Sequence, residues 1–213
     1  REEKVDFQGE HYQHPYTGPG SVGLGKALKP ITHPLRRKIP IFIGAEGPKN
    51  ATQTAEIADG WFPLYYSPWR QDVYADQLTG ASDDFQIAVI CPFVVTGPTE
   101  AEIAEGLAGI RMMLAFYIGG MGAEGQNYHT KLASRMGLGD AALEIQRKFL
   151  GGDQAGAIDA VPASFADEIA LVGPPERFKE RLSVWRDSPV TTLLIHASDS
   201  HGLQTAAELV LEG

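Results

Sequence analysis

Cysteine is nearly absent from this sequence of 213 residues, which contains only Cys91. A disulfide within the chain is therefore excluded, and so is a metal cluster held by several cysteines. This usage is typical of a protein that works in a reducing compartment, and we expect a cytoplasmic location. The apolar residues around Cys91 predict a buried, inert thiol rather than a nucleophile.

Positively charged residues are also few: the sequence has 18 Lys and Arg against 27 Asp and Glu, which gives a net charge of -9. The overall field disfavours a nucleic-acid-binding protein or a protein of anionic membranes, because it repels phosphate groups. A local site for one phosphorylated small molecule stays compatible with this charge. We expect no membrane-spanning run and find no secretion signal. The expected partner is therefore a small-molecule substrate, not nucleic acid or membrane.

Hydrophobic residues make up 43% of the chain and charged residues 21%, as in ordinary globular proteins, and the length suffices for one large domain. The sequence opens on Arg1 without an initiator Met, so we interpret it as the later part of a longer chain. Glycine and proline recur throughout residues 1–38, which predicts an extended connection. Residues 119–172 contain no convincing strand pattern and are expected to form an all-helical insertion.

Strand and helix patterns alternate over the rest of the chain. Apolar runs bounded by turn residues predict strands at 41–43, 61–65, 85–95 and 191–196. Pro92 predicts a bulge in the third strand, or an interruption near its end. Helices are expected from Pro48, over 68–78, after residues 96–100, from Pro174–Pro175 and over 203–211. This alternation predicts an α/β fold with a parallel sheet of about four strands. Two architectures fit it: half of an eightfold barrel, or a small open sheet.

Familiar catalytic constellations are missing. No Ser-His-Asp set or pair of carboxylates can be assembled from the spacing. Residues 18–23 fit a dinucleotide-binding glycine pattern and residues 20–26 most of a phosphate loop, but neither follows a strand pattern or opens a helix pattern, so we reject both. His11 and His14 have no acidic partner nearby and are interpreted as surface residues rather than metal ligands.

The loop Gly44-Ala45-Glu46-Gly47-Pro48 is more informative, because it joins a predicted strand to a predicted helix. Exposed N–H groups at a helix start carry partial positive charge and suit an anion such as phosphate. A plain tight turn explains the same residues about equally well. Other strand ends carry Leu64 to Ser67, Pro92 and Phe93, and His196 to Ser200, which in a parallel barrel would share one rim. Tyr65 and Tyr66 could line a site there or pack beneath helices.

Residues 39–64, IPIFIGAEGPKNATQTAEIADGWFPL, resemble the central segment of the bacterial luciferase-like monooxygenase family. Residues 5–12, 117–122, 127–128, 160–162, 171–174 and 177–182 agree with its F420-dependent oxidoreductase branch. The resemblance implies the C-terminal portion of a TIM (β/α)8-type barrel, usually a homodimer, with its first four strands outside this chain. It also implies coenzyme F420, or alternatively FMN, at the C-terminal rim of the barrel.

By the same resemblance, Gly44, Ala45, Glu46, Gly47 and Pro48 would line the phosphate-bearing side chain of the cofactor, flanked by Phe62, Pro63 and Leu64. Residues 119–122 would lie near the substrate. The implied activity is hydride transfer between the deazaflavin and an organic substrate. Three alternatives stay open: an FMN-dependent monooxygenase, a non-catalytic cofactor-binding relative, and an assembly module with open strand edges. His196 is a candidate proton carrier or a structural histidine.

Overall fold

The computed structural model describes residues 5–26, 33, 35–36 and 38–211, and the chain divides into two compact units, Arg1–Ile39 and Pro40–Gly213. The first unit contains a small antiparallel hairpin of β1 (Phe7–Gln8) and β2 (Gln13–His14), in which the N–H of Gly9 donates to the carbonyl of Tyr12 at 2.9 Å. The expectation of a purely extended connection over residues 1–38 is therefore wrong at this hairpin. The rest of that range includes residues outside the described part of the chain.

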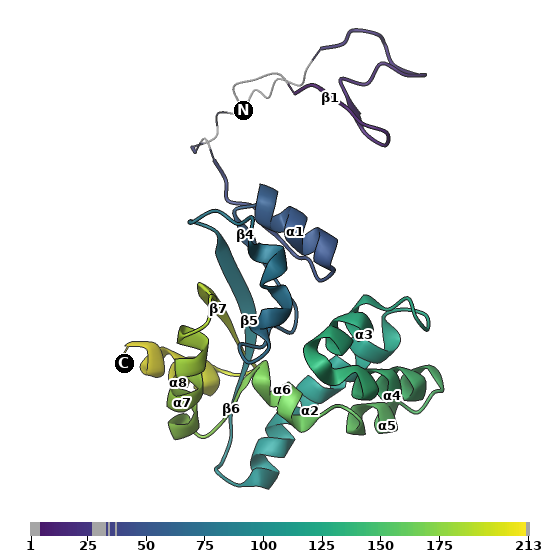
Figure 1. Ribbon diagram of the computed structural model, residues 1–213. Helices are drawn as coiled ribbons and strands as arrows, with labels where there is room; N and C mark the ends of the chain where they lie inside the picture. The colour runs from purple at the N-terminus through teal and green to yellow at the C-terminus, as the bar shows by residue number, and fades with distance from the viewer. Residues whose placement is uncertain (1–4, 27–32, 34, 37, 212–213) are drawn as a thin grey trace. The chain divides into compact units, whose positions relative to one another are not determined.

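The second unit is built on a parallel sheet, as the sequence predicts, but the sheet has five strands rather than about four (Figure 1). The additional strand includes residues 171–172, which were expected to belong to the helical insertion. Its strands are β3 (Phe42–Ile43), β4 (Gly60–Trp61), β5 (Gln86–Val95), β6 (Leu171–Gly173) and β7 (Thr192–Ala197). The long strand β5 pairs with β4, β6 and β7. Phe93 lies opposite both Leu171 and Ala197, so β6 and β7 flank opposite edges of β5.

Helices connect and cover these strands. They are α1 (Pro48–Ile57), α2 (Glu100–Ala115), α3 (Tyr128–Ala133), α4 (Gly139–Leu150), α5 (Gln154–Asp159), α6 (Ala163–Glu168), α7 (Pro175–Arg186) and α8 (Ser200–Leu211). Short π-helical segments, η3 (Phe116–Gly120) and η4 (Ser134–Leu138), continue α2 and α3. Figure 1 shows α3, α4 and α5 gathered in one cluster, whereas α7 and α8 lie near β7. Residues 128–168 are thus largely helical, and the expected insertion ends in strand β6.

The helix starts follow local sequence chemistry. Pro48 begins α1 and Pro175 begins α7, where a fixed φ and a missing N–H cost nothing. Thr99 caps α2 in a reciprocal arrangement with Glu102, whose backbone N–H donates to the Thr99 hydroxyl while its carboxylate accepts from the Thr99 N–H. These helix positions confirm the sequence expectation.

Three expected elements differ from the structure. The strand at 61–65 stops at Trp61, because Pro63 has no N–H to donate and Tyr65 turns the chain with a left-handed φ of 57°. The helix expected over 68–78 is two short 3₁₀ turns, η1 (Gln71–Tyr74) and η2 (Asp76–Leu78). The bulge expected at Pro92 is absent from its pairing with β7, since residues 88–93 pair one-to-one with residues 192–197.

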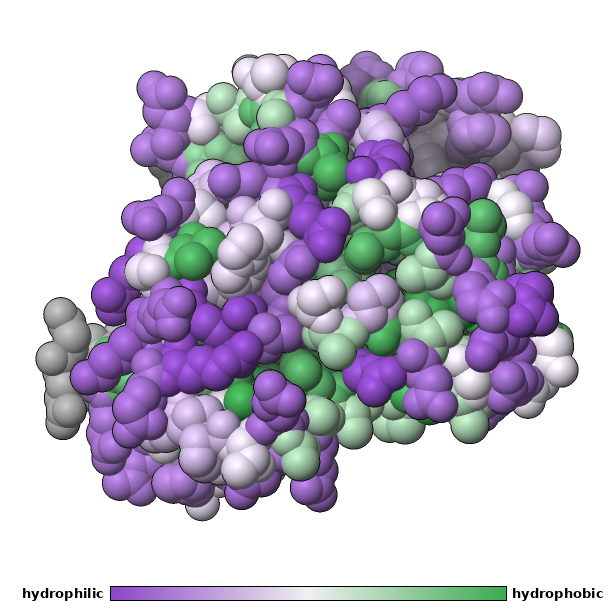
Figure 2. Space-filling view, turned by 60° about the horizontal axis from the view of Figure 1, so that its bottom comes forward, coloured by the Kyte–Doolittle hydropathy of each residue, from purple (hydrophilic) through white to green (hydrophobic). Residues whose placement is uncertain are grey.

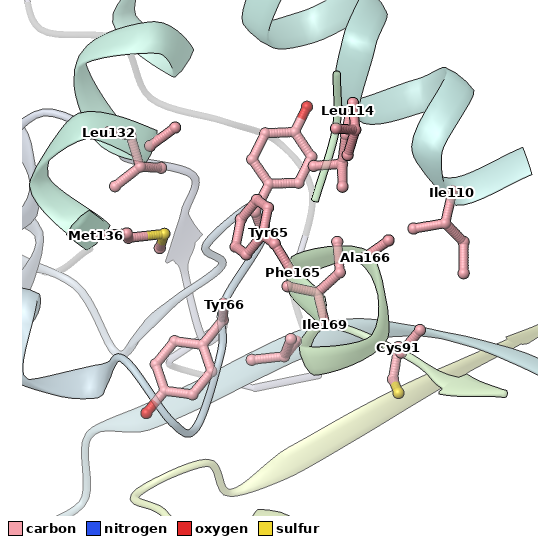
Figure 3. Close-up of a cluster of buried hydrophobic side chains, with 14 of the residues drawn as sticks. Tyr65, Tyr66, Cys91, Ile110, Leu114, Leu132, Met136, Phe165, Ala166 and Ile169 are labelled. Atoms are coloured by element: carbon pink, nitrogen blue, oxygen red, sulfur yellow. The ribbon is translucent and has the colours of Figure 1, made fainter. Parts of the chain in front are cut away.

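The hydrophobic core lies between the sheet and the helices. Figure 3 shows part of it, with Ile110 and Leu114, Leu132 and Met136, and Phe165 and Ile169 gathered around Tyr65. Its largest fully buried side chains are Trp61, Trp185, Tyr66, Tyr74, Phe93, Phe165 and Phe178. On the face seen in Figure 2, apolar residues appear as patches interspersed with hydrophilic ones.

The stretch Glu100–Gly120, which includes α2, has 21 residues and is long and apolar enough to cross a membrane by length and composition alone. By that measure the sequence expectation of no such segment is wrong. Leu107, Ile110 and Leu114 are buried, and α2 contacts β6 and α6. A core helix passes the same test as a membrane span, and we interpret α2 as a core helix.

Candidate functional site

The loop between β3 and α1, together with the first residue of α1, contains five of the residues predicted to bind the cofactor. Gly47 is the N-cap of α1, and its carbonyl accepts the first helical hydrogen bond from the N–H of Ala51 at 2.9 Å. Within the described part of the chain, the N–H groups of Glu46, Gly47 and Lys49 have no hydrogen-bond acceptor. A Cβ added at Gly47 would meet no atom within 4 Å, so the surface beside these groups is open. The loop therefore has the donors and the space that an anion requires.

The turn after β4 contains the other three predicted residues, and it lies directly against this loop. The backbone N–H of Leu64 donates to Glu46 Oε1 at 2.6 Å, and the N–H of Phe62 donates to the carbonyl of Ile43 at 3.0 Å. The indole N–H of Trp61 donates to the carbonyl of Ala45 at 2.8 Å. The structure thus brings residues 44–47 and 62–64 together at the carboxyl ends of two parallel strands. Ala45 and Pro63 are buried there, whereas Gly44 and Pro48 are exposed.

Arg135 is a neighbour of this loop that sequence reasoning missed. It lies in η4, and its guanidinium donates to the backbone carbonyl of Glu46 at 2.7 Å. Gly137, in the same segment, has a φ of 83°, which an L side chain rarely adopts. No sequence pattern marks a contact between residues 89 positions apart, because it depends on how the helical segment folds back.

Burial dominates the electrostatics of Glu46. It raises the pKa of this carboxyl group from 4.5 to about 7, while the Leu64 N–H and the charge of Arg135 act in the opposite direction. The second carboxyl oxygen, Oε2, is buried and has no hydrogen-bond partner in the described structure. A carboxyl group of this kind changes its charge close to neutral pH.

A cavity of about 490 Å³ lies beside the turn after β4. Its lining is mostly aliphatic and includes Pro63 and Leu64, two of the predicted cofactor residues. The polar side chains in the lining are Tyr65, Tyr117 and His196. Because Leu64 lines the cavity and also donates to Glu46, the cavity adjoins the loop at residues 44–47. An apolar cavity with few polar groups suits an organic molecule.

The side chains of Tyr65 and Tyr66 lie in two different environments. Figure 3 shows their rings pointing in opposite directions. Tyr65 lines the cavity and makes edge contacts with Tyr117 and His129, at centroid distances of 5.7 and 5.8 Å. Tyr66 instead packs among Trp61, Tyr74 and Trp185 in the core. Of the two interpretations of this pair, the cavity wall applies to Tyr65 and core packing to Tyr66.

Several other sequence interpretations have a clear outcome. Burial raises the pKa of the Cys91 thiol to about 12, which confirms an inert buried residue. His11 is exposed and His14 half-buried, and no group of His, Cys, Asp or Glu in the described residues is arranged to hold a metal ion. Residues 119–122, which the resemblance places near the substrate, are not among the residues that line this cavity. Gly119 and Gly120 instead lie against the ring of Phe149.

Comparisons with known proteins agree with this geometry. A protein of Mycobacterium tuberculosis provisionally named as a coenzyme F420-dependent oxidoreductase is 40% identical over 219 aligned residues, which include 99% of this chain and 62% of that protein. The chain thus spans less than two thirds of the length of this relative.

Two solved structures share the fold. The coenzyme F420-dependent tetrahydromethanopterin reductase of Methanopyrus kandleri matches 81% of this chain and 49% of its own, with 21% identity and a TM-score of 0.57. An F420-dependent secondary alcohol dehydrogenase, solved with an F420–acetone adduct, matches 96% of this chain and 53% of its own, with 10% identity and a TM-score of 0.54. The parallel sheet therefore corresponds to part of a TIM-type barrel.

The family description "luciferase-like monooxygenase" matches residues 1–192, which is most of the sequence. Together with the relative at 40% identity, this match confirms the family expected from residues 39–64. The chain belongs to the luciferase-like monooxygenase family.

Proposed function

We propose that this chain is part of an F420-dependent oxidoreductase that transfers a hydride between the deazaflavin and an organic substrate. The observation that carries the proposal is the pair of adjoining loops, 44–48 and 62–64, beside an apolar cavity. The first of them has N–H groups without an acceptor among the described residues. The relative at 40% identity, provisionally named as an F420-dependent oxidoreductase, supports this cofactor over others.

The proposed roles follow from position. Gly44, Ala45, Glu46, Gly47 and Pro48 hold the phosphate-bearing side chain of the cofactor, mainly through backbone N–H groups near the start of α1. Phe62, Pro63 and Leu64 flank it, and Pro63 and Leu64 extend the contact to the cavity. When bound, reduced F420 supplies the hydride. The protein excludes water with its aliphatic lining and orients the substrate.

His196 is the candidate for handling the accompanying proton. It lies in β7 opposite Pro92, is exposed, and lines the cavity with Tyr65 and Tyr117. An imidazole in contact with both cavity and solvent can exchange protons with each of them. A structural role for His196 is the alternative, and replacing it by Gln distinguishes the two: loss of turnover with retained cofactor binding favours proton transfer.

An FMN-dependent monooxygenase is the second candidate, because the family description itself names monooxygenases. Titration of the full-length protein with F420 and with FMN, followed by fluorescence, separates the two candidates. We expect tight F420 binding and weak FMN binding, and the reverse order overturns the cofactor assignment. A protein that binds F420 without hydride transfer would instead be a non-catalytic relative.

We further propose a homodimer in the cytoplasm, with residues 1–38 as a connection and residues 119–172 as an insertion in one barrel domain. Strands β3 and β7 have free outer edges in the described part of the chain, which favours completion of the sheet by further polypeptide. Light scattering on the full-length protein tests the assembly, and a monomeric mass contradicts it.

A further inference from the structure

The carboxyl group of Glu46 occupies an unusual position for a loop that is proposed to bind an anion. One oxygen already accepts the Leu64 N–H at 2.6 Å, and the other is buried without a donor in the described residues. Leaving a buried oxygen of an ionised carboxylate without a donor costs free energy. This carboxyl group is thus poorly adapted to carrying a full negative charge where it lies.

The groups around Glu46 do not neutralise it. Arg135 in η4 is the nearby cation, but its guanidinium donates to the backbone carbonyl of Glu46 rather than to the carboxyl group. Tyr65, after β4, and Tyr74, in η1, stay neutral, because burial raises the pKa of both phenols and the charge of Glu46 raises it further. Lys49, on α1 itself, is exposed to solvent. A second negative charge at this loop would meet a negative charge that is already incompletely compensated.

We propose that Glu46 takes up a proton when the anionic side chain of the cofactor binds to this loop, so that binding and protonation are coupled. The inference rests on the proposed function, because it concerns the same loop. Protonation removes the repulsion between the two anions. It also removes the full charge from the oxygen that is buried without a donor in the described residues, while the other oxygen still accepts from Leu64.

The direction of the pH dependence follows from linkage. Burial places the pKa of Glu46 at about 7 in the free protein, and a bound anion raises it further. Below about pH 7 the group is already protonated, so the affinity is constant. Above it each binding event must draw a proton from solution, and the affinity falls by up to about tenfold per pH unit until the pKa of the bound state is reached.

Calorimetric titration of the full chain with F420, at several values from about pH 6 to 9 and in two buffers of different ionisation enthalpy, measures both affinity and proton uptake. The test variant is Glu46→Gln, in which the amide oxygen can still accept from Leu64. The matched control is Glu56→Gln, which removes an exposed carboxylate from α1, the helix that follows the loop. We expect proton uptake and weaker binding above about pH 7 in the wild type and in Glu56→Gln, and a smaller effect in Glu46→Gln. Titration of F420 itself contributes equally to all three proteins.

Identical proton uptake in the wild type and in Glu46→Gln overturns the inference about Glu46. The proposed function is not affected by that result, because F420 still binds. No F420 binding by the wild type at any pH rejects the proposed function instead. A second measurement needs no variant: carboxyl-carbon NMR follows the titration of Glu46 with and without F420. A midpoint that rises on binding supports the coupling, and an unchanged midpoint contradicts it.

Discussion

The carboxyl group of Glu46 accepts a hydrogen bond from the backbone N–H of Leu64 at 2.6 Å, which joins the loops that follow two neighbouring parallel strands. The two residues are 18 positions apart, separated by helix α1. One loop has N–H groups that find no acceptor in the described part of the chain, and the other contributes to the cavity. This bond therefore fixes the position of the proposed cofactor-binding loop relative to the proposed substrate cavity.

Stability should depend on pH through Glu46. Its pKa is about 7 in the folded protein and 4.5 ordinarily, so between these values the folded state holds a proton that the unfolded state has lost. The free energy of unfolding contributed by this group is therefore greatest at low pH and falls as the pH rises from 4.5 to about 7, by up to about 1.4 kcal/mol per unit. Urea unfolding at several pH values should show this fall in the wild type but not in Glu46→Gln. Parallel curves for the two proteins would contradict it.

Arg135 should stabilise the loop through its bond to the Glu46 carbonyl. Arg135→Met removes the guanidinium but retains most of the aliphatic chain, and we expect unfolding to become easier by about 1–2 kcal/mol. Arg147→Met is the control, because Arg147 is exposed on α4 and pairs with Glu144, one turn away. Urea unfolding compares the variants. Equal stability of Arg135→Met and the wild type would show that the bond to Glu46 contributes nothing.

The ion pair between Arg70 and Glu168 should help to hold α6 and η4 against the segment that contains Arg70. Arg70 makes a bidentate contact with Glu168, at 2.6 and 2.9 Å, and also donates to the carbonyl of Met136 at 2.6 Å. Arg70→Met would leave Glu168 half-buried with only the Ser67 hydroxyl as a donor among the described residues. We expect Arg70→Met to lower the free energy of unfolding by about 2 kcal/mol. This is less than the loss expected for a fully buried pair, because both side chains keep some contact with solvent.

A double-mutant cycle with Glu168→Gln, measured by urea unfolding, isolates the coupling between the two side chains. Additive losses in the double variant would mean that the two residues act independently.

The alternation of strands and helices, the Pro48 and Pro175 helix starts and the adjoining loops at 44–47 and 62–64 could all be predicted from the sequence, because they depend on local chemistry and on the parallel arrangement. The contact of Arg135 with Glu46 could not, since it depends on long-range folding of the helical segment. Tyr65 was expected in a strand, but its left-handed φ places its ring in the cavity wall instead. Propensity does not reveal such a conformation, because tertiary packing imposes it.

Gly119, which the family resemblance places near the substrate, is closely packed against α4. A Cβ at this position would lie 2.6 Å from the Cβ of Phe149 and 3.2 Å from the carbonyl of Ile145. Gly119→Ala should therefore destabilise the protein by about 1–3 kcal/mol through overpacking, without a direct effect on ligand binding. Gly109→Ala is the matched control on the exposed face of α2, where a Cβ meets no atom within 4 Å, and it should stabilise by about 0.5–1 kcal/mol through helix propensity. Thermal unfolding of both variants tests the contrast, and a Gly119→Ala protein as stable as Gly109→Ala would mean that Phe149 moves aside at no cost.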